Sequence, residues 1–537
     1  MRNDWWRGAV IYQIYPRSFK DSNGDGIGDL PGITSKLSYI AALGVDAIWI
    51  SPFFRSPMKD FGYDVSDYRD VDPIFGSLAD FDDLIKQAHA LGLKVIIDQV
   101  LSHTSDQHAW FKASRQSRDN PKSDWYVWAD ARPDGSPPNN WLSVFGGSAW
   151  RWDTRRCQYY LHSFLVEQAD LNFHNTDVQL ALLEEVRFWC ERGVDGFRFD
   201  ACNHHFHDQA LRSNPPAVKQ KVSTVRADNP YAMQLHWYDK SQPENLDFLE
   251  SLREVLDQYG VASVGEVGDE DPAAIMADYT EEGKRLHMAY SFALTTPDHS
   301  ASYIREQVRR LDRMMGLSQG WACWALSSHD VVRVASRWAP QPPILWMTLL
   351  AVLRGSICIY QGEELGLPEA NVPFEKLQDP YGKTFWPEFK GRDGCRTPMP
   401  WVANAEQGGF SEGEPWLPMA SSHLRLAVDV QQQQEDSMLQ FCKRLLQWRR
   451  TKTELMTGKM RWIGVTEPLL GIVREQVGKP PLLALFNLSE MPQSVSLSEA
   501  GMEAVDDSPV PSQYAGYVEN GTAFLPPYGI LLSAVHV

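Results

Sequence analysis

The sequence has little cysteine. Its 537 residues include 7 Cys, an odd number, and none of them forms a Cys-x-x-Cys pair. A regular, even set would indicate a disulfide framework, and paired cysteines would indicate a zinc site. The sequence therefore argues against both, and we expect reduced thiols that are mostly buried.

Long apolar segments are also missing. No stretch reaches the roughly 20 apolar residues that span a membrane. The first residues, Met-Arg-Asn-Asp-Trp-Trp-Arg, lack the apolar run of a signal peptide. We therefore expect a cytoplasmic protein with no membrane partner.

Positive charge is in deficit. Lys and Arg total 51 against 69 Asp and Glu, which gives a formal net charge of −18. An acidic protein repels phosphate backbones, so nucleic acid is a poor candidate partner. Aromatic residues, by contrast, are plentiful, with 20 Trp, 19 Tyr and 23 Phe. Their flat faces can stack on sugar rings, although most aromatic side chains simply pack in cores.

The segment from Gly196 to Asp200 reads Gly-Phe-Arg-Phe-Asp. In a strand, alternate side chains share a face, so Arg198 and Asp200 should point one way and the two Phe the other. A cation beside a carboxylate lowers its pKa, so we predict an ionised Asp200 able to attack carbon. For an isolated Arg-x-Asp, the alternative is a structural ion pair at a strand end.

Other strand-like runs end in similar groups. Asp98 and His103 follow the run at 93–100, Glu266 lies at the end of 261–267, and His329 and Asp330 follow 323–326. Further strands are expected at 9–15, 45–51, 288–292 and 356–360, with helical patterns at 178–193, 245–260 and 344–355. Alternating strands and helices with polar groups at the strand ends predict an α/β fold, a (β/α)8 TIM barrel with its site at that face.

Two segments depart from the barrel pattern. Residues 104–172 form a connection much longer than a barrel needs, and we expect an inserted subdomain that walls the mouth of the site. After a helix at 436–450, short strand-like runs follow at 462–467, 469–476, 482–488 and 529–537. The predicted domains are a barrel of residues 1–103 and 173–455, the insertion, and an antiparallel β domain of residues 456–537.

Eight short motifs occur in one order along the chain. They are Tyr12–Phe19, Gly62–Tyr68, Asp98–His103, Gly196–Asp200, Gly265–Glu266, His329–Asp330, Tyr360–Glu364 and Gly391–Trp401. Together they resemble the α-amylase family of glycoside hydrolases, and within it the bacterial α-glucosidase and oligo-1,6-glucosidase group. The resemblance covers nearly the whole chain and implies catalysis with retention of configuration.

The resemblance implies three catalytic acids. Asp200 corresponds to the nucleophile that forms a glucosyl ester, and Glu266 to the acid that protonates the leaving oxygen and later activates water. Asp330 corresponds to a third acid that holds the 2- and 3-hydroxyls of the sugar. A double displacement of this kind needs the two reacting carboxyl groups roughly 5 to 5.5 Å apart.

The resemblance also implies a set of substrate-binding residues. His103, Arg198 and His329 correspond to donors around the sugar, Asp60 and Arg396 to a pair that closes the pocket, Tyr63 to a stacking platform, and Phe145 and Phe164 to walls. For His103 a core histidine is the alternative, and for the three aromatic residues it is plain packing.

Four residues depart from the family pattern. Ser102 and Ser328 stand where asparagine is usual before each histidine, Ala169 replaces a proline, and Pro400 replaces a glutamine. None is a carboxylate. The departures put in question the hydrogen bonds behind the two histidines and the shape of the outer rim.

Oxygen-bearing side chains alternate in the segment from Asp21 to Asp29. Asp21, Asn23, Asp25, the carbonyl of Ile27, and Asp29 could surround a hard cation, calcium or magnesium, as similar loops in the family do. Gly32 stands at the twelfth position, so the loop is not an EF-hand. A metal-free Asp/Gly turn is the alternative. We expect no organic cofactor.

The predicted function is an exo-acting α-glucosidase that acts on short α-glucosides and transfers glucose to hydroxyl acceptors. Ala201, directly after Asp200, is where many α-1,6-specific relatives carry valine, so we expect a preference for maltose-type α-1,4 bonds. Alternatives are oligo-1,6-glucosidase, sucrose hydrolase or isomerase, trehalose synthase, and a non-catalytic amylase-like binding domain. The sequence carries no signal for an oligomeric state.

Overall fold

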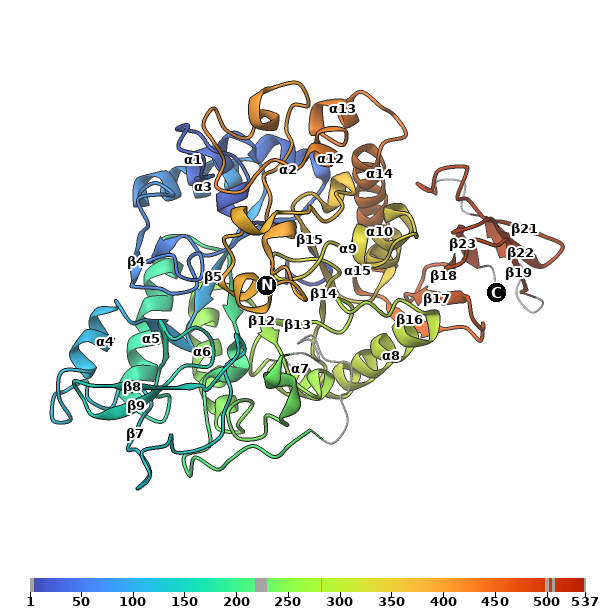
Figure 1. Ribbon diagram of the computed structural model, residues 1–537. Helices are drawn as coiled ribbons and strands as arrows, with labels where there is room; N and C mark the ends of the chain where they lie inside the picture. The colour runs from blue at the N-terminus through green and yellow to red at the C-terminus, as the bar shows by residue number, and fades with distance from the viewer. Residues whose placement is uncertain (1–3, 218–228, 282, 498–501, 505–507, 536–537) are drawn as a thin grey trace.

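The centre of the molecule is a ring of parallel strands surrounded by helices (Figure 1). The computed structural model describes residues 4–217, 229–281, 283–497, 502–504 and 508–535. The strand order is β13-β12-β11-β5-β2-β1-β15-β14, and a single parallel bridge between Ala289 and Ala322 closes the ring. The strands are β1 (Val10–Ile14), β2 (Ala47–Ile50), β5 (Lys94–Val100), β11 (Gly196–Asp200), β12 (Ala262–Val267), β13 (Met288–Ser291), β14 (Cys323–Ala325) and β15 (Ser356–Tyr360). The predicted (β/α)8 barrel is confirmed.

Helices alternate with these strands. The longer ones are α3 (Leu78–Ala90), α5 (Thr176–Glu191), α6 (Asn245–Tyr259), α7 (Pro272–Tyr279), α8 (Ala301–Ser318), α10 (Pro343–Val352) and α14 (Met438–Thr451). Shorter ones are α1 (Leu30–Ser35), α2 (Leu37–Leu43), α9 (Val334–Arg337), α11 (Pro380–Phe385), α12 (Ser421–Leu424), α13 (Val428–Gln432) and α15 (Thr453–Thr457). The helical patterns predicted at 178–193, 245–260 and 344–355 correspond to α5, α6 and α10.

Local sequence explains where several helices begin and end. Ser77 and Asp80 form a capping box at the start of α3, and Gly260 ends α6 in the left-handed conformation that glycine adopts at low cost. The apolar sequence of α10 is buried on all sides, as expected for a helix packed between other elements. The strands are likewise almost entirely buried, because both faces of the barrel sheet are covered.

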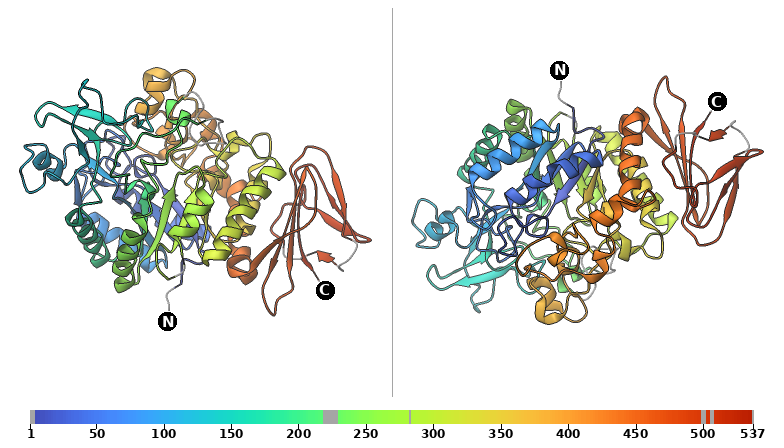
Figure 2. Two further views of the ribbon diagram at one scale, coloured as in Figure 1. Left: turned by 90° about the horizontal axis from the view of Figure 1, so that it is seen from below. Right: turned by 90° about the horizontal axis from the view of Figure 1, so that it is seen from above.

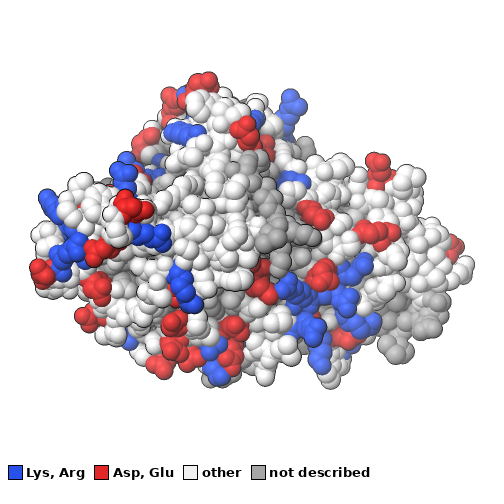
Figure 3. Space-filling view, turned by 60° about the horizontal axis from the view of Figure 1, so that its bottom comes forward, with Lys and Arg blue, Asp and Glu red and all other residues white. Residues whose placement is uncertain are grey.

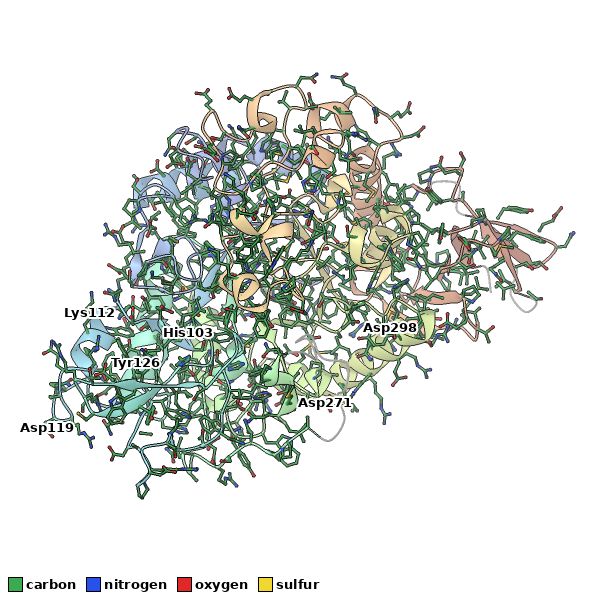
Figure 4. All side chains as sticks on the ribbon, in the orientation of Figure 1. His103, Lys112, Asp119, Tyr126, Asp271 and Asp298 are labelled. Atoms are coloured by element: carbon green, nitrogen blue, oxygen red, sulfur yellow. The ribbon has the colours of Figure 1, made fainter. Side chains whose placement is uncertain are left out.

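The segment between β5 and α5 carries its own small sheets. They contain β6 (His103–Ser105) paired with β10 (Gln168–Asp170), and β7 (Trp128–Ala129), β8 (Trp150–Asp153) and β9 (Gln158–Leu161), beside α4 (Ala109–Ser114). In Figure 4, Lys112 and Asp119 mark its outer edge, whereas His103 lies deeper, toward the barrel. The insertion thus joins the barrel at the end of β5, where the site was predicted. A further hairpin, β3 (Phe54–Arg55) with β4 (Asp67–Val71), follows β2.

The C-terminal segment is an antiparallel β structure, as predicted. Its strands are β16 (Lys459–Trp462), β17 (Leu469–Glu475), β18 (Leu482–Asn487), β19 (Gln493–Ser496), β20 (Met502–Ala504), β21 (Tyr517–Glu519), β22 (Thr522–Leu525) and β23 (Ile530–Val535). The strand predicted at 462–467 is wrong. Trp462 pairs with Ile472 at the end of the β16–β17 hairpin, so residues 463–468 form its connection. The last two residues of the run predicted at 529–537 lie outside the described residues.

The two ends of the barrel carry different segments. In both views of Figure 2 the N-terminal segment lies on the face opposite the insertion and the segment around residues 370–410. Charges of both signs are interspersed on the face shown in Figure 3. All seven cysteines are free, and among the described residues no helix is long and apolar enough to cross a membrane.

Candidate active site

One buried arginine joins three of the predicted strand-end carboxylates. Arg198 Nη1 lies 2.6 Å from Asp200 Oδ1 and 2.9 Å from Asp98 Oδ1, and its Nη2 lies 2.7 Å from Glu266 Oε1. These residues come from β5, β11 and β12, which are neighbours in the sheet. We call Arg198, Asp98, Asp200 and Glu266 the Arg198 cluster. The alternation predicted for Gly196–Asp200 is confirmed, since Phe197 and Phe199 stack on the other face.

The lowered pKa predicted for Asp200 is wrong. Burial raises the pKa of Asp200 to about 7, because Arg198 offsets only part of the desolvation and Asp98 adds negative charge. Burial also raises the pKa of Glu266 to about 7 and that of Asp98 to about 6. One cation cannot compensate for three desolvated acids, so the cluster holds protons near neutral pH.

Aromatic side chains complete this cluster. The Tyr290 hydroxyl accepts from Arg198 Nη2 at 2.8 Å and donates to Glu266 Oε1 at 3.0 Å. Trp49 Nε1 donates to Asp98 Oδ2 at 3.2 Å, and the Tyr63 hydroxyl donates to the same oxygen at 3.0 Å. Every carboxylate of the cluster is therefore held by more than its contact with Arg198 alone, except Asp200, whose hydrogen bond comes from Arg198.

Two arginines surround the third predicted acid. Asp330 Oδ1 lies 3.0 Å from Arg396 Nη2 and 3.2 Å from Arg392 Nη1. Burial alone would raise the pKa of Asp330, but His329, Arg392 and Arg396 hold it well below its usual range. Asp330 is therefore ionised at neutral pH, which suits a carboxylate that accepts hydrogen bonds from sugar hydroxyls.

Asp60 does not pair with the predicted arginine. Its ion-pair partner is Arg392, with Nη2 2.9 Å from Asp60 Oδ1, whereas Arg396 donates Nε–H to the carbonyl of His329 and Nη2–H to Asp330. Arg392 is also bound by Asp379, at 2.8 Å through Nη2 and 3.1 Å through Nε. We call Arg392, Arg396, Asp60, Asp330 and Asp379 the Arg392 cluster.

His103 and His329 are neutral, buried members of the site. Burial lowers the pKa of His103 to about 4 and that of His329 to about 3. Gln13 Nε2 donates to His329 Nδ1 at 2.8 Å, which assigns the ring proton to Nε2, 3.1 Å from Asp330 Oδ2. The Tyr63 hydroxyl, which donates to Asp98, accepts from His329 Nε2–H at 2.7 Å, so the neutral ring links Gln13 to Tyr63 beside Asp330 without adding charge.

The departures from the family pattern have local explanations. Ser102 Oγ lies 2.9 Å from His103 Nδ1, and Ser328 Oγ accepts the backbone N–H of Asp330 at 3.2 Å. Each serine thus supports a site residue with its hydroxyl. Ala169 lies in β10 opposite Thr104. The carbonyl of Pro400 accepts a hydrogen bond from the backbone N–H of Val428 at 2.9 Å. Neither of these contacts involves a carboxylate.

The predicted aromatic residues lie around the two clusters. The Phe164 ring is 5.2 Å from the His103 ring and 6.4 Å from the Phe145 ring. The Arg392 guanidinium lies 5.2 Å from the centre of the Phe145 ring. Tyr63 stacks on His329, with ring centres 5.4 Å apart and planes nearly parallel. Their roles as walls and platform for a sugar stay predictions.

Ala201 connects Asp200 and Glu266 through its backbone. It has φ 39° and ψ 43°, the left-handed conformation, which is uncommon for a residue other than glycine. Its N–H donates to Glu266 Oε2 at 3.1 Å, directly after Asp200 in the chain. The turn therefore fixes Asp200 and Glu266 relative to each other.

The predicted cation loop closes on its own hydrogen bonds. Asp21 accepts from the amides of Asn23, Gly24 and Gly26; Asn23 accepts from Asp25, Asp25 from Ile27, and Asp29 from Ser22 and Gly32. The candidate metal ligands of this loop are all oxygen atoms, as a hard cation requires. However, no three Asp, Glu, His or Cys side chains of the described residues are grouped as metal ligands. A cation stays a prediction, and the turn needs none for its hydrogen bonds.

Sequence reasoning did not select Arg392, Gln13 or Tyr290 as site residues. Arg392 stands four residues before Arg396 in the same motif, so a count of arginines could have raised the question of which one contacts Asp60. Gln13 and Tyr290 lie inside strands already assigned to the barrel, with side chains that the strand alternation directs inward. Asp98 ends its predicted strand, and its sequence context assigns it no role.

A barrel whose strand ends bring together Asp200, Glu266 and Asp330 is the architecture of a carboxylate-dependent glycoside hydrolase. Residues 13–458 match the family model described as "Alpha amylase, catalytic domain". The chain belongs to this family.

Three similar proteins place it more closely. A "Probable alpha-glucosidase" of Rhizobium meliloti (strain 1021) is 55% identical over 514 residues, covering 94% of this chain and 93% of the relative. An oligo-1,6-glucosidase of Heyndrickxia coagulans is 37% identical over 527 residues, covering 91% and 92%. The crystal structure of the alpha-glucosyl transfer enzyme XgtA superposes with a TM-score of 0.96 at 57% identity and covers 99% of each chain.

Proposed function

We propose that the protein is a retaining, exo-acting α-glucosidase that hydrolyses short α-glucosides and transfers glucose to hydroxyl acceptors. The observation that carries the proposal is the position of Asp200 and Glu266 on neighbouring nitrogens of one buried guanidinium. The relatives described as an α-glucosidase and an alpha-glucosyl transfer enzyme support the same reaction.

In the first step, an Asp200 carboxylate oxygen attacks the anomeric carbon while Glu266 gives its proton to the leaving glycosidic oxygen. The bond from carbon to the leaving oxygen breaks as the ester to Asp200 forms. In the second step Glu266, now ionised, takes a proton from water or from an acceptor hydroxyl, whose oxygen displaces Asp200. Two inversions give net retention.

The Arg392 cluster supports the exo mode of action. Asp60 and Asp330 are both bound to Arg392, and we propose that this charged group closes one end of the pocket around a sugar held by Asp330. Such a pocket accommodates one terminal glucose. We expect disaccharides to be good substrates and internal bonds of starch to be cleaved negligibly.

The preference for maltose-type α-1,4 bonds rests on the small side chain of Ala201 beside Asp200. Oligo-1,6-glucosidase is the main alternative, since one relative carries that name. Sucrose hydrolase or isomerase and trehalose synthase share the same acids and differ on the acceptor side. A non-catalytic binding domain would not need Asp200, Glu266 and Asp330 together, so we favour an enzyme.

The test is product analysis by ¹H NMR with maltose, isomaltose, sucrose and trehalose as separate substrates. We expect rapid release of α-glucose from maltose, slower release from isomaltose, and transfer products when an alcohol is added. Release of β-glucose would contradict retention. Isomerisation of sucrose without net hydrolysis of maltose would favour the isomerase alternative.

A cytoplasmic location and a structural cation at residues 21–29 belong to the same proposal. The first is supported by seven unpaired cysteines, as a reducing compartment maintains them. The second is supported by the oxygen donors of the loop. Cell fractionation tests the location, and metal analysis tests the cation.

A further inference from the structure

A cavity of about 330 Å³ opens at the end of the barrel away from the carboxylates. It lies at the N-terminal ends of β12 and β13, where Ala262 and His287 line it. Glu266 is four residues further along β12, which corresponds to about 13 Å at ~3.3 Å per residue. Trp6 also lines the cavity, and the N-terminal segment lies opposite the insertion in Figure 2.

Aromatic rings form one side of this cavity. The Trp6 ring lies 5.2 Å from the His287 ring and 6.5 Å from the Trp321 ring, both at steep angles. The Arg7 guanidinium lies 4.5 Å from the centre of the Trp6 ring and 5.1 Å from that of Trp321. The wall therefore combines apolar ring surface with a planar hydrogen-bond donor, a combination that suits a sugar ring with its hydroxyls.

His287 directs a polar atom into the cavity. The side chain is only 9% exposed, and Ser263 Oγ both accepts the backbone N–H of His287 and lies 2.9 Å from its Nδ1. The contacts of the described residues give the Ser263 hydroxyl no acceptor other than Nδ1, so we assign its proton to that bond and the ring proton to Nε2. Nε2 lies 3.9 Å from Asp257 Oδ1, too far for a hydrogen bond, and the contacts of the described residues give it no other hydrogen bond.

A ligand hydroxyl group could bridge His287 Nε2 and Asp257 Oδ1. It would accept from His287 Nε2–H and donate to the Asp257 carboxylate, which a single anion or cation could not do at once. The charged residues that line the cavity are balanced in number, since Asp4 and Asp257 are matched by Arg7 and Arg253. Arg253 Nε lies 2.6 Å from Asp257 Oδ1. Balanced charge favours a neutral ligand with several hydroxyls.

We propose that this cavity is a second saccharide site, which binds a neutral monosaccharide at the N-terminal end of the barrel. It is separate from the catalytic pocket and does not depend on the proposed function. The ligand class follows from the aromatic wall, the donor–acceptor pair of His287 and Asp257, and the balanced charge.

Glucose titration followed by NMR tests the site, with ¹⁵N-labelled tryptophan and assignment by single Trp→Phe variants. Trp321 Nε1, bonded to Ser356 Oγ at 3.0 Å, reports the cavity, and Trp49 Nε1, bonded to Asp98, reports the catalytic pocket. We expect both signals to shift and saturate independently, the Trp321 signal at millimolar glucose.

A matched pair of glycine variants locates the effect. Gly260 lines the cavity and Gly92 does not line it; both have positive φ, 66° and 77°, and open space around a built Cβ. Asparagine tolerates this conformation. Gly260→Asn should weaken the glucose response of Trp321 by at least about tenfold while the Trp49 response and maltose turnover persist. Gly92→Asn should change neither signal. His287→Leu should also weaken the Trp321 response.

Three outcomes would overturn the proposal. Trp321 could stay unmoved while Trp49 shifts; Trp321 could respond equally in Gly260→Asn; or inorganic phosphate could shift Trp321 where glucose does not, which would indicate an anion site. Failure of the proposed function would look different, because Trp49 would then ignore glucose and maltose would not be hydrolysed.

Discussion

Two groups of buried charges meet at the catalytic end of the barrel, and their balance is opposite. The Arg198 cluster has three acids for one arginine, and burial raises the pKa values of Asp200 and Glu266 to about 7. The Arg392 cluster has three acids for two arginines. There the pKa values of Asp330 and Asp379 are lowered despite burial, and only that of Asp60 is raised.

The number of cations thus separates two kinds of carboxylate, although the Asp330 side chain is also more exposed, at 25%, than that of Asp200, at 11%. The acids to which we assign proton transfer and nucleophilic attack share one arginine, and burial raises their pKa values to about 7. Asp330, to which we assign substrate binding, contacts two arginines and stays ionised. A proton-transfer group and a permanent acceptor can therefore stand close together without exchanging roles.

The largest effect should come from the nucleophile in the Arg198 cluster. Asp200→Asn removes the oxygen nucleophile, so no ester can form, and kcat on maltose should fall by about 10⁴-fold or more. Circular dichroism and the thermal transition should show a folded protein. Turnover like that of the wild type from a clean preparation would contradict the assignment.

Glu266→Gln should be nearly as severe for maltose but mild for an aryl glucoside with an activated leaving group, because such a substrate needs no proton. In the wild type, kcat/KM should fall below about pH 7 as Asp200 gains a proton and above about pH 7 as Glu266 loses one. Since the two groups interact, the limbs report the pair.

In Glu266→Gln, the alkaline limb of the aryl-glucoside profile should disappear, and azide should restore turnover. Retention of that limb, or equal damage with good and poor leaving groups, would show that Glu266 is not the acid.

Arg392→Gln leaves the Arg392 cluster with one arginine, the same number as in the Arg198 cluster. Loss of a buried charge partner of Asp60 and Asp330 should lower kcat/KM for maltose by about 10²-fold or more. Removal of a cation should raise the pKa of Asp330 from its lowered position, whereas the acid-side limb, which reports Asp200 and Glu266, should stay near pH 7. Arg461→Gln, which breaks an exposed ion pair with Glu475, serves as the control and should change neither quantity. A kcat/KM for maltose like that of the wild type in Arg392→Gln would contradict the role given to this arginine.

Ala201→Val should have a smaller, selective effect. Added bulk beside Asp200 should shift the ratio of kcat/KM for maltose and isomaltose toward isomaltose by an amount equivalent to about 1 to 3 kcal/mol. A β-branched residue at φ 39° is strained, so activity on both sugars should also decline. Ala201→Gly accepts this φ and should leave the ratio nearly unchanged. An unchanged ratio in the valine variant would remove Ala201 from the specificity argument.

The smallest expected effect concerns the loop at residues 21–29, far from either cluster in sequence. If a cation is bound, chelation should lower Tm by a few degrees, and Asp21→Ala should remove the difference. Elemental analysis of active enzyme that finds neither calcium nor magnesium would end the cation proposal.

The sequence predicted the barrel well because strand burial and helical periodicity are local signals. The false strand at 462–467 arose because an apolar run in a hairpin connection resembles a short strand. The pairing of Asp60 with Arg396 failed for another reason, since two arginines in one motif differ only in where the folded loop directs them. The pKa of Asp200 required Asp98 and Glu266, which come from other strands.

The strands of the barrel are not all paired over the same length. Elsewhere each neighbouring pair aligns three or more residues, whereas among the described residues β13 meets β14 through the one bridge from Ala289 to Ala322. Local opening of a protein starts where the fewest hydrogen bonds must break. The barrel therefore has a seam, and β13, which carries Tyr290 beside Glu266, is one edge of it. Local opening between β13 and β14 should therefore disturb the hydrogen bond from Tyr290 to Glu266 before it disturbs Asp200 on β11.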